Sequence, residues 1–198
     1  QAVAMQRGLA AAELTVETCG GLRRVSVRPT ERPAEAWARV DMGVVTSGPP
    51  VERSPSAALC AAAGAELRLV SADIGNPHLV VLVDDPSTID LARFGPELES
   101  GFAGGINVEF IRATPGRRDE LDLTVWERGA GITQACGTGA SAASAVAAGW
   151  GLVESPVTVH LPGGDVVVTG WLPARTNALI DAFWDLVYPA MMGILTAC

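Results

Sequence analysis

The stretch E-R-G-A-G-I-T-Q-A-C-G-T-G-A, residues 127–140, is where a strand pattern gives way to a helix pattern. The helix that it opens, predicted at Thr138–Gly149, is rich in Ala and Ser. A helix with small side chains on every face can be packed closely by strands on all sides. The sequence therefore predicts an α+β fold in which strands wrap around a central helix.

Short strand patterns lie on both sides of this helix. A second helix is predicted at Ile89–Ser100, and the Pro-, Gly- and Ser-rich segment Ser47–Pro55 is the best linker candidate. Strands, the first two joined as a hairpin over Gly20-Gly21, are predicted at Glu13–Cys19, Leu22–Arg28, Trp37–Met42, Glu66–Val70, Leu79–Val83, Ile106–Ala113, Leu121–Trp126, Val157–Leu161 and Asp165–Thr169.

The composition is that of a folded protein. The chain has 198 residues, of which 48% are apolar, and a net charge of −8. This length suffices for one large domain or two small ones. The 14 basic residues are scattered rather than gathered into a stripe, so nucleic acid is not expected as a partner.

Neither a membrane span nor a metal site is expected. The apolar segment Ala178–Cys198 contains two aspartates and a proline, which a transmembrane helix would be expected to lack. The first residues do not show the pattern of a signal peptide. The four cysteines lack zinc or redox spacing, and the two histidines, His78 and His160, lie far apart in sequence. We therefore expect a cytoplasmic protein with reduced thiols.

Cys136 is the first candidate for chemistry. At the start of a helix, backbone N–H groups and the positive end of the helix dipole both favour thiolate over thiol. We therefore expect Cys136 to exchange a proton or to attack an electrophile. The alternative is an inert buried thiol, which is what most cysteines are.

Two pairs of polar residues are candidates for the same site. Glu127 would orient or exchange protons with a group near Cys136, and Arg128 would clamp a carboxylate with its fork of donors. Asn76, held extended by the proline that follows, offers an amide, and His78 offers general acid–base catalysis. The alternatives are a solvated ion pair and an ordinary turn histidine.

Taken together, these motifs resemble the diaminopimelate epimerase family. The resemblance covers roughly residues 1–171, with the blocks in the family's order. The cysteine block alone is shared with proline racemases, whereas the combination of G-N-P-H with E-R-G-A-G is much more specific. The matching blocks are G-N-P-H at 75–78, I-N-V at 106–108, E-R-G-A-G at 127–131, A-C-G-T-G-A at 135–140 and L-P-G-G at 161–164.

The resemblance implies a pyridoxal-free isomerase that needs no cofactor and interconverts LL- and meso-diaminopimelate. In the family, two cysteines face each other across the substrate Cα, one from each of two similar domains. One thiolate removes the α-proton, and the other thiol delivers a proton to the opposite face. Without a cofactor, the site must stabilise the carbanion with aimed donors in a closed, dry pocket. The implied partner is a small amino-acid substrate, and a homodimer is compatible with this interpretation.

The resemblance also implies a role for each matching residue. Cys136 is one of the two thiols, Glu127 is its polar neighbour, and His78 is similar to the residue beside the opposite thiol. The implied substrate-binding residues are Asn76, Asn107, Glu127 and Arg128 at the substrate's polar groups, and the N–H groups of Gly137 and Thr138 at the α-carboxylate.

Two departures from the family pattern bear on domain organisation. The G-N-G-x-R-C block of the family's other cysteine is absent and would end just ahead of the helical pattern Gln1–Leu9; Cys19 and Cys60 are poor substitutes. The segment Leu172–Cys198 lacks the M-T-G-P-A block and the final strand that the family has there. We therefore predict a partial N-terminal domain at 1–45, a C-terminal domain at 46–171 and an atypical tail at 172–198.

Three alternatives stay open at this point. A proline racemase-like isomerase would share the cysteine block, although a distal carboxylate clamp such as Arg128 has no purpose for proline. A non-catalytic remnant would explain both departures. A cysteine hydrolase with His78 as base is a weaker idea, because nothing else argues for acyl transfer.

Overall fold

The computed structural model describes residues 12–18, 21–30, 36–65, 67–170 and 182–189. Its elements in chain order are β1 (Ala12–Thr18), β2 (Gly21–Pro29), β3 (Ala36–Ser47), α2 (Ala57–Ala63), β4 (Arg68–Asp73), β5 (Pro77–Leu82), the 3-10 turn η1 (Pro86–Thr88), α3 (Leu91–Glu99), β6 (Asn107–Ala113), β7 (Glu120–Glu127), β8 (Gly131–Ile132), α4 (Gly137–Gly149), β9 (Val157–Leu161), β10 (Gly164–Gly170) and β11 (Ala182–Pro189).

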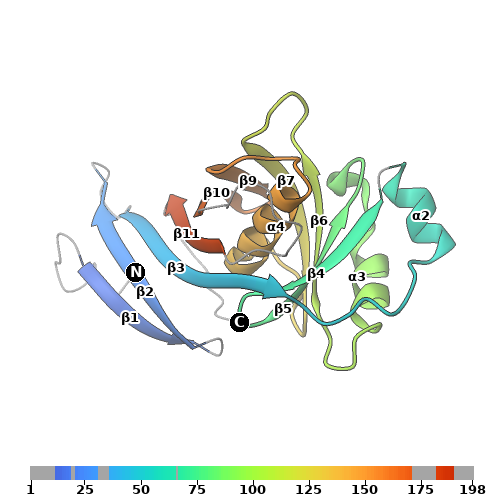
Figure 1. Ribbon diagram of the computed structural model, residues 1–198, viewed down its shortest axis with the longest axis horizontal. Helices are drawn as coiled ribbons and strands as arrows, with labels where there is room; N and C mark the ends of the chain where they lie inside the picture. The colour runs from blue at the N-terminus through green and yellow to red at the C-terminus, as the bar shows by residue number, and fades with distance from the viewer. Residues whose placement is uncertain (1–11, 19–20, 31–35, 66, 171–181, 190–198) are drawn as a thin grey trace.

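The strands of these ranges form one sheet that curls around α4. Eight strands pair in the order β3-β11-β10-β9-β7-β6-β5-β4, and β4 pairs back with β3, which closes a ring. The β5–β6 and β7–β9 pairs are parallel and the other pairs of the ring are antiparallel. Helix α4 lies inside and contacts all eight strands (Figure 1). The predicted α+β fold with strands around a central helix is confirmed.

The composition of α4 explains why it can lie there. Its residues from Gly139 to Ala147 are all buried, and most are Ala, Ser or Gly. The hydroxyl of Ser141 donates to the carbonyl of Gly137 at 2.9 Å, so this polar group is satisfied inside the helix. Small side chains thus let the surrounding strands approach the helix on all sides.

The strands β4 to β7 are covered on both faces. On β5, Val80 and Leu82 belong to the core around α4, whereas Leu79 and Val81 belong to a second core beneath α2 and α3. Side chains alternate across a sheet, so a strand buried on both faces reads as a continuous apolar run. This explains the uninterrupted apolar stretch of β5 and fixes which of its residues face α4.

The element boundaries confirm most of the predicted strands and both predicted helices, and they add elements that the sequence did not indicate. Helix α2, the turn η1 and the short strand β8 were not predicted. The expectation of no final strand within Leu172–Cys198 was wrong, since β11 pairs with both β10 and β3. The helical pattern Gln1–Leu9 and Cys19-Gly20 lie outside the described residues.

The beginning of the predicted linker, Ser47–Pro55, is bound along β4. The N–H of Gly48 donates to the carbonyl of Ser71 at 3.2 Å, and the hydroxyl of Ser71 donates to the carbonyl of Pro49. A Cβ at Gly48 would lie within 2.9 Å of the Ala72 backbone, so only glycine allows this approach. None of the described helices is both long and apolar enough to cross a bilayer.

Candidate functional site

The E-R-G-A-G motif forms the turn that leads from β7 toward α4. Glu127 ends β7, and β8 turns back to pair with it, so that Glu127 stands opposite Gly131. Gly129 and Gly131 have φ values of 78° and 81°, in the left-handed region that favours glycine. The chain then enters α4 with Cys136 in the extended N-cap position, φ −138° and ψ 110°. The motif therefore places the Glu127 carboxylate and the Cys136 thiol in one small region.

Cys136 is buried, with 7% of its surface exposed. Its Sγ lies 3.4 Å from the hydroxyl of Thr138. Burial raises the pKa of the Cys136 thiol, and the nearby charges of Glu109 and Glu127 raise it further. Hydrogen bonds from Thr138 and the Gly139 backbone act in the opposite direction without offsetting this. Burial and the two carboxylates thus act against the thiolate that the helix start was expected to favour, and the reactivity of Cys136 stays a prediction.

Glu127 is buried beside this thiol, with 2% of its surface exposed. Its carboxylate accepts a hydrogen bond from the hydroxyl of Thr133, which follows β8. Its charge raises the pKa of the Cys136 thiol. A joint role of Glu127 and Cys136 stays a prediction.

The G-N-P-H motif forms the tight turn between β4 and β5 and reaches the start of α4. Gly75 has φ 101°, and its N–H donates to the Asp73 carboxylate at 2.8 Å. The half-buried side chain of Asn76 donates from Nδ2 to the hydroxyl of Thr138 at 3.4 Å. Because Thr138 also contacts Cys136, this hydroxyl joins the Asn76 turn to the thiol.

Asn107 and Arg128 form a second cluster at the beginning of β6. Asn107 is buried, its Nδ2 donates to the carbonyl of Pro77 at 2.9 Å, and its Oδ1 accepts from the Arg128 backbone N–H at 2.9 Å. The Arg128 side chain is exposed and donates to the carbonyl of Gly104 at 3.0 Å. A Cβ at Gly105 would come within 2.9 Å of the Arg128 side chain, so glycine makes room for it. Asn107 therefore fixes the backbone that presents the Arg128 guanidinium.

His78 contacts Glu109, a residue that the sequence motifs did not single out. Its Nδ1 lies 2.6 Å from Oε1 of Glu109, and both side chains are fully buried. Burial raises the pKa of Glu109, and the charge of Glu127 adds to this, while His78 acts in the opposite direction. The missed signal was a lone carboxylate inside the apolar strand pattern I-N-V-E-F-I, next to a strand that begins with a histidine.

Alternation of side chains explains why these groups meet. His78 shares the face of Val80 and Leu82, which pack around α4. Glu109 lies directly opposite Val125, another residue of the α4 core, and so points the same way. His78 is hydrogen-bonded to Glu109, and none of the described contacts joins it to Cys136.

The L-P-G-G motif packs against the residues that directly precede Cys136. The N–H of Gly163, in the turn between β9 and β10, donates to the carbonyl of Gln134 at 2.7 Å. A Cβ at Gly163 would lie 2.9 Å from that same carbonyl oxygen. The turn therefore packs directly on the segment that carries Cys136.

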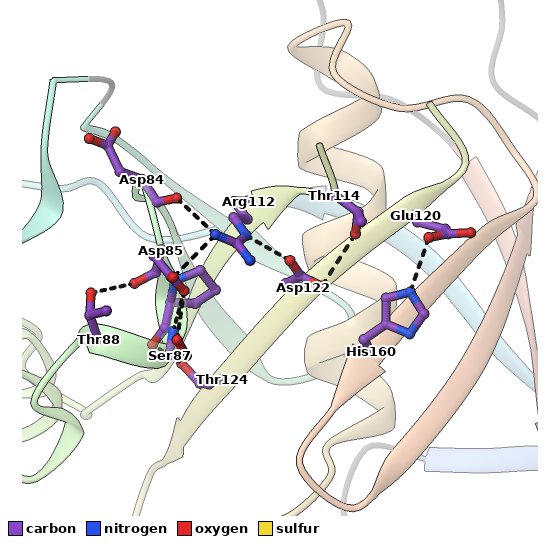
Figure 2. A network of polar contacts seen from close by, with 11 residues as sticks. Asp84, Asp85, Ser87, Thr88, Arg112, Thr114, Glu120, Asp122, Thr124 and His160 are labelled. Atoms are coloured by element: carbon purple, nitrogen blue, oxygen red, sulfur yellow. Dashed lines mark hydrogen bonds and ion pairs between the residues drawn. The ribbon is translucent and has the colours of Figure 1, made fainter. Parts of the chain in front are cut away.

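Other reactive or charged groups lie away from this site. Cys60 is exposed on α2, which packs on the opposite face of the sheet from α4. Arg112, at the other end of β6 from Asn107, binds Asp122 and Asp85 in the polar network of Figure 2. In the part of the chain that the structure describes, no three His, Cys, Asp or Glu side chains gather as metal ligands.

Comparison of the sequence with known proteins gives consistent matches. A family model described as diaminopimelate epimerase matches residues 70–172. The diaminopimelate epimerase of Desulfitobacterium hafniense is 40% identical over 167 residues, which are 78% of this chain and 56% of that protein. The diaminopimelate epimerase of Stutzerimonas stutzeri is 38% identical over 159 residues, 77% of this chain and 55% of that protein. The chain thus spans about half the length of these curated relatives.

Solved structures share the fold at lower sequence identity. A Bacillus anthracis phenazine biosynthesis protein of the PhzF family matches with a TM-score of 0.65 at 16% identity, over 93% of this chain and 68% of that chain. A hydroxyproline epimerase from Agrobacterium vitis, with bound trans-4-hydroxy-L-proline, matches with a TM-score of 0.61 at 16% identity, over 90% of this chain and 56% of that chain. These likenesses establish the curled sheet around a central helix.

Proposed function

Because this chain belongs to the diaminopimelate epimerase family, we propose that it carries one half of the site of a cofactor-independent epimerase acting on LL- and meso-diaminopimelate. The observation that supports the proposal most is the buried Cys136 thiol at the start of α4, with Glu127 beside it. A stereocentre is inverted when a base removes a proton from one face and an acid delivers one to the other. Cys136 supplies one of these two groups.

The environment of Cys136 suits it to deliver the proton first. Burial and two carboxylates raise the pKa of its thiol, which favours the protonated form, an acid. A substrate α-carboxylate at the N–H groups of Gly137 and Thr138 would lie at the positive end of α4. The developing carbanion would then be stabilised by donors already in place.

The second thiol belongs to the G-N-G-x-R-C block of the family, which is not found in residues 1–198. The 198-residue chain alone is therefore proposed to be an incomplete copy that does not epimerise its substrate. The proposed substrate is a small amino acid with a distal carboxylate, for which the exposed Arg128 guanidinium is the clamp. A cytoplasmic location and a homodimer remain predictions from the sequence.

An activity assay with a restored first block tests this proposal. The chain would be extended at its N-terminus with the segment of the Desulfitobacterium hafniense relative that precedes the matching region. We expect LL- to meso-diaminopimelate turnover by the extended protein and none by the chain alone. C136A should lower kcat by roughly 10²–10⁴-fold, the usual contribution of a positioned proton-transfer group.

The controls separate this function from its alternatives. C60S should leave the rate unchanged, because Cys60 is exposed on the other face of the sheet. Turnover of proline instead of diaminopimelate would support the racemase-like alternative. A folded extended protein without activity toward either substrate, or a C136A variant that stays fully active, would contradict the proposal.

A further inference from the structure

Glu109 is a buried carboxylate to which the sequence motifs assign no role. It lies in the middle of β6 with 0% of its surface exposed, between the apolar residues Val108 and Phe110. A carboxylate in such surroundings is strongly unfavourable unless a partner compensates for its lost hydration. What Glu109 contacts should therefore explain why it is there.

Two contacts hold the Glu109 carboxylate in place. Oε1 lies 2.6 Å from Nδ1 of His78, whose side chain is equally buried. The carboxylate also lies against the first turn of α4, since a Cβ at Gly139 would stand 2.6 Å from the same oxygen. The carboxylate thus lies between His78 of β5 and the helix that begins after Cys136.

The other ring nitrogen of His78, Nε2, is buried and makes no hydrogen bond within the described ranges. A neutral imidazole carries one proton, so if Nδ1–H donates to the Glu109 carboxylate, Nε2 presents a lone pair. A buried, unpaired lone pair is a site that accepts a proton.

We propose that Glu109 is a positioning residue, which holds the His78 ring in its Nδ1–H tautomer and so makes Nε2 a proton acceptor. The inference rests on the proposed function, in which His78 stands beside the thiol opposite Cys136. That thiol gives its proton to Nε2 and keeps the S–H electron pair, which leaves the thiolate that removes the α-proton. The imidazolium formed is stabilised by the Glu109 carboxylate.

The ionisable groups that face Glu109 come from three neighbouring elements. They are His78 of β5, Glu127 of β7 and Cys136 at the start of α4, each of which interacts electrostatically with it. Glu127 and Cys136 are acids, so neither compensates for a negative charge on Glu109. His78 is the group that does, which is why the hydrogen bond between them decides how both behave.

The nitrogen chemical shifts of His78 test the proposal directly. The 198-residue chain would be labelled with ¹⁵N-histidine, and H160Q would leave His78 as the one histidine and assign its signals. The spectrum would be recorded about two pH units above the ordinary histidine pKa of roughly 6.5, where a free imidazole is neutral. We expect protonated Nδ1 and bare Nε2, with the other tautomer at least about tenfold less populated.

Substitution of Glu109 provides a second test of the proposal. E109L removes the acceptor at similar volume, and we expect the tautomer ratio to fall by about tenfold or more, as the loss of a hydrogen bond to a charged group implies. E154Q, which neutralises an exposed carboxylate, should leave the ratio unchanged. A role for Glu109 in packing alone would leave the ratio of E109L at its original value.

The wild-type spectrum alone can overturn the proposal, even if E109L does not fold. A proton on Nε2 under these conditions, in a neutral or a charged ring, would show that Nε2 is no acceptor. Neither readout depends on turnover. Failure of the epimerase assay would therefore count against the proposed function, whereas a wrong tautomer would count against the role of Glu109.

Discussion

Cys136 shows how its surroundings set the state of a single residue. The start of a helix favours a thiolate, but Cys136 is only 7% exposed, and the charges of Glu109 and Glu127 act on its thiol. Loss of hydration favours the neutral thiol, and so do the two nearby negative charges. Helix position alone can be inferred from sequence, whereas burial depends on the strands that surround α4, and this is why the sequence did not indicate the raised pKa of the thiol.

The raised pKa of Cys136 predicts a loss of stability in alkaline solution. Above an ordinary thiol pKa of about 8.5 the unfolded chain releases this proton while the folded chain keeps it, so the free energy of unfolding falls by up to about 1.4 kcal/mol per pH unit. The sequence has no lysine and one tyrosine, which limits competing titrations. Urea unfolding from about pH 8 to about pH 10.5 would measure it.

The matched comparison uses a background in which Cys136 is the remaining cysteine. In that background C136A should lack the alkaline decline, because alanine has no proton to keep. Equal slopes with and without the thiol would show that its pKa is ordinary. The background replaces Cys19, Cys60 and Cys198 with serine.

Gly139 is a second residue at the site whose surroundings leave no room for a larger side chain. A Cβ there would lie 2.6 Å from Oε1 of the buried Glu109, so G139A must displace the carboxylate or the helix. We expect G139A to lower the free energy of unfolding by about 1–3 kcal/mol, as overpacking does, although alanine is the better helix former. G149A, at the exposed end of the same helix, should be neutral or stabilising by up to about 1 kcal/mol. Urea unfolding of both variants would measure this, and equal effects would contradict it.

At the scale of elements, the sequence predicted what local patterns determine. The Ala/Ser pattern gave the central helix α4, and the apolar runs of β5 and β6 gave buried strands. The glycine-rich motifs gave the turns that carry Asn76 and Glu127, since their left-handed backbone requires glycine at Gly75, Gly129 and Gly131. These parts of the site follow from short stretches of chain.

Elements that depend on distant partners could not be predicted in this way. Strand β11 pairs with β10, which precedes it, and with β3, which lies far away in sequence. The pairing of His78 with Glu109 depends on the parallel register of β5 and β6, in which His78 stands opposite Asn107. No local pattern indicates which strands lie side by side, so the contact between His78 and Glu109 appeared only in the fold.

Arg112 links β6 to β7 at the end of β6 that lies away from Asn107. Its guanidinium donates to Asp122 at 2.7 Å, pairs with Asp85 at 3.2 Å and donates to the carbonyl of Asp84 at 3.4 Å (Figure 2). The Asp122 carboxylate raises the pKa of Arg112 more than the other neighbours do. R112A should lower the free energy of unfolding by about 1 kcal/mol, because it breaks a half-buried hydrogen-bonded pair.

Urea unfolding would measure this change. R117A, which removes the ion pairs of the more exposed Arg117 with Asp119 and Glu120, should have little effect. The alkaline behaviour of Cys136 should be the same in R112A as in the unaltered chain, because the network lies at the opposite end of the strands. A change at Cys136 would show that the two ends are coupled.

His160 joins β7, β9 and β10 through its two ring nitrogens. Nδ1 lies 2.8 Å from the Asp165 carboxylate and Nε2 lies 3.3 Å from that of Glu120. Burial alone would lower the pKa of His160, but the hydrogen bonds and charges of these two carboxylates outweigh burial and raise it. The resulting stabilisation is fully present below about pH 6.5 and is lost as the pH rises through the raised value.

H160Q should therefore flatten the pH dependence of stability from about pH 6 to about pH 8. The effect should stay below about 1 kcal/mol, since about a third of the side chain is exposed and water screens its charges. Urea unfolding at several pH values would measure the difference between H160Q and the unaltered chain. Parallel curves would contradict the raised pKa.

At the scale of the whole molecule, a ring of strands encloses the helix whose start carries the Cys136 thiol. Helix α4 is enclosed by eight strands, and its first turn meets Glu109, Asn76 and Cys136. The chain spans 56% of the Desulfitobacterium hafniense relative, and the division at 45/46 and 171/172 stays a prediction. In the proposed mechanism, a second domain of similar fold would supply the thiol that faces Cys136.

The fate of hydrogen at the substrate Cα tests this two-thiol mechanism most directly. The extended protein would convert LL-diaminopimelate in D₂O, and early product and remaining substrate would be analysed for deuterium at Cα. If separate thiols remove and deliver the proton, the product carries solvent deuterium while the remaining substrate keeps its hydrogen. Deuterium that enters substrate and product at the same rate, or product that retains the original hydrogen, would show that a single group moves the proton and that Cys136 is not one of two.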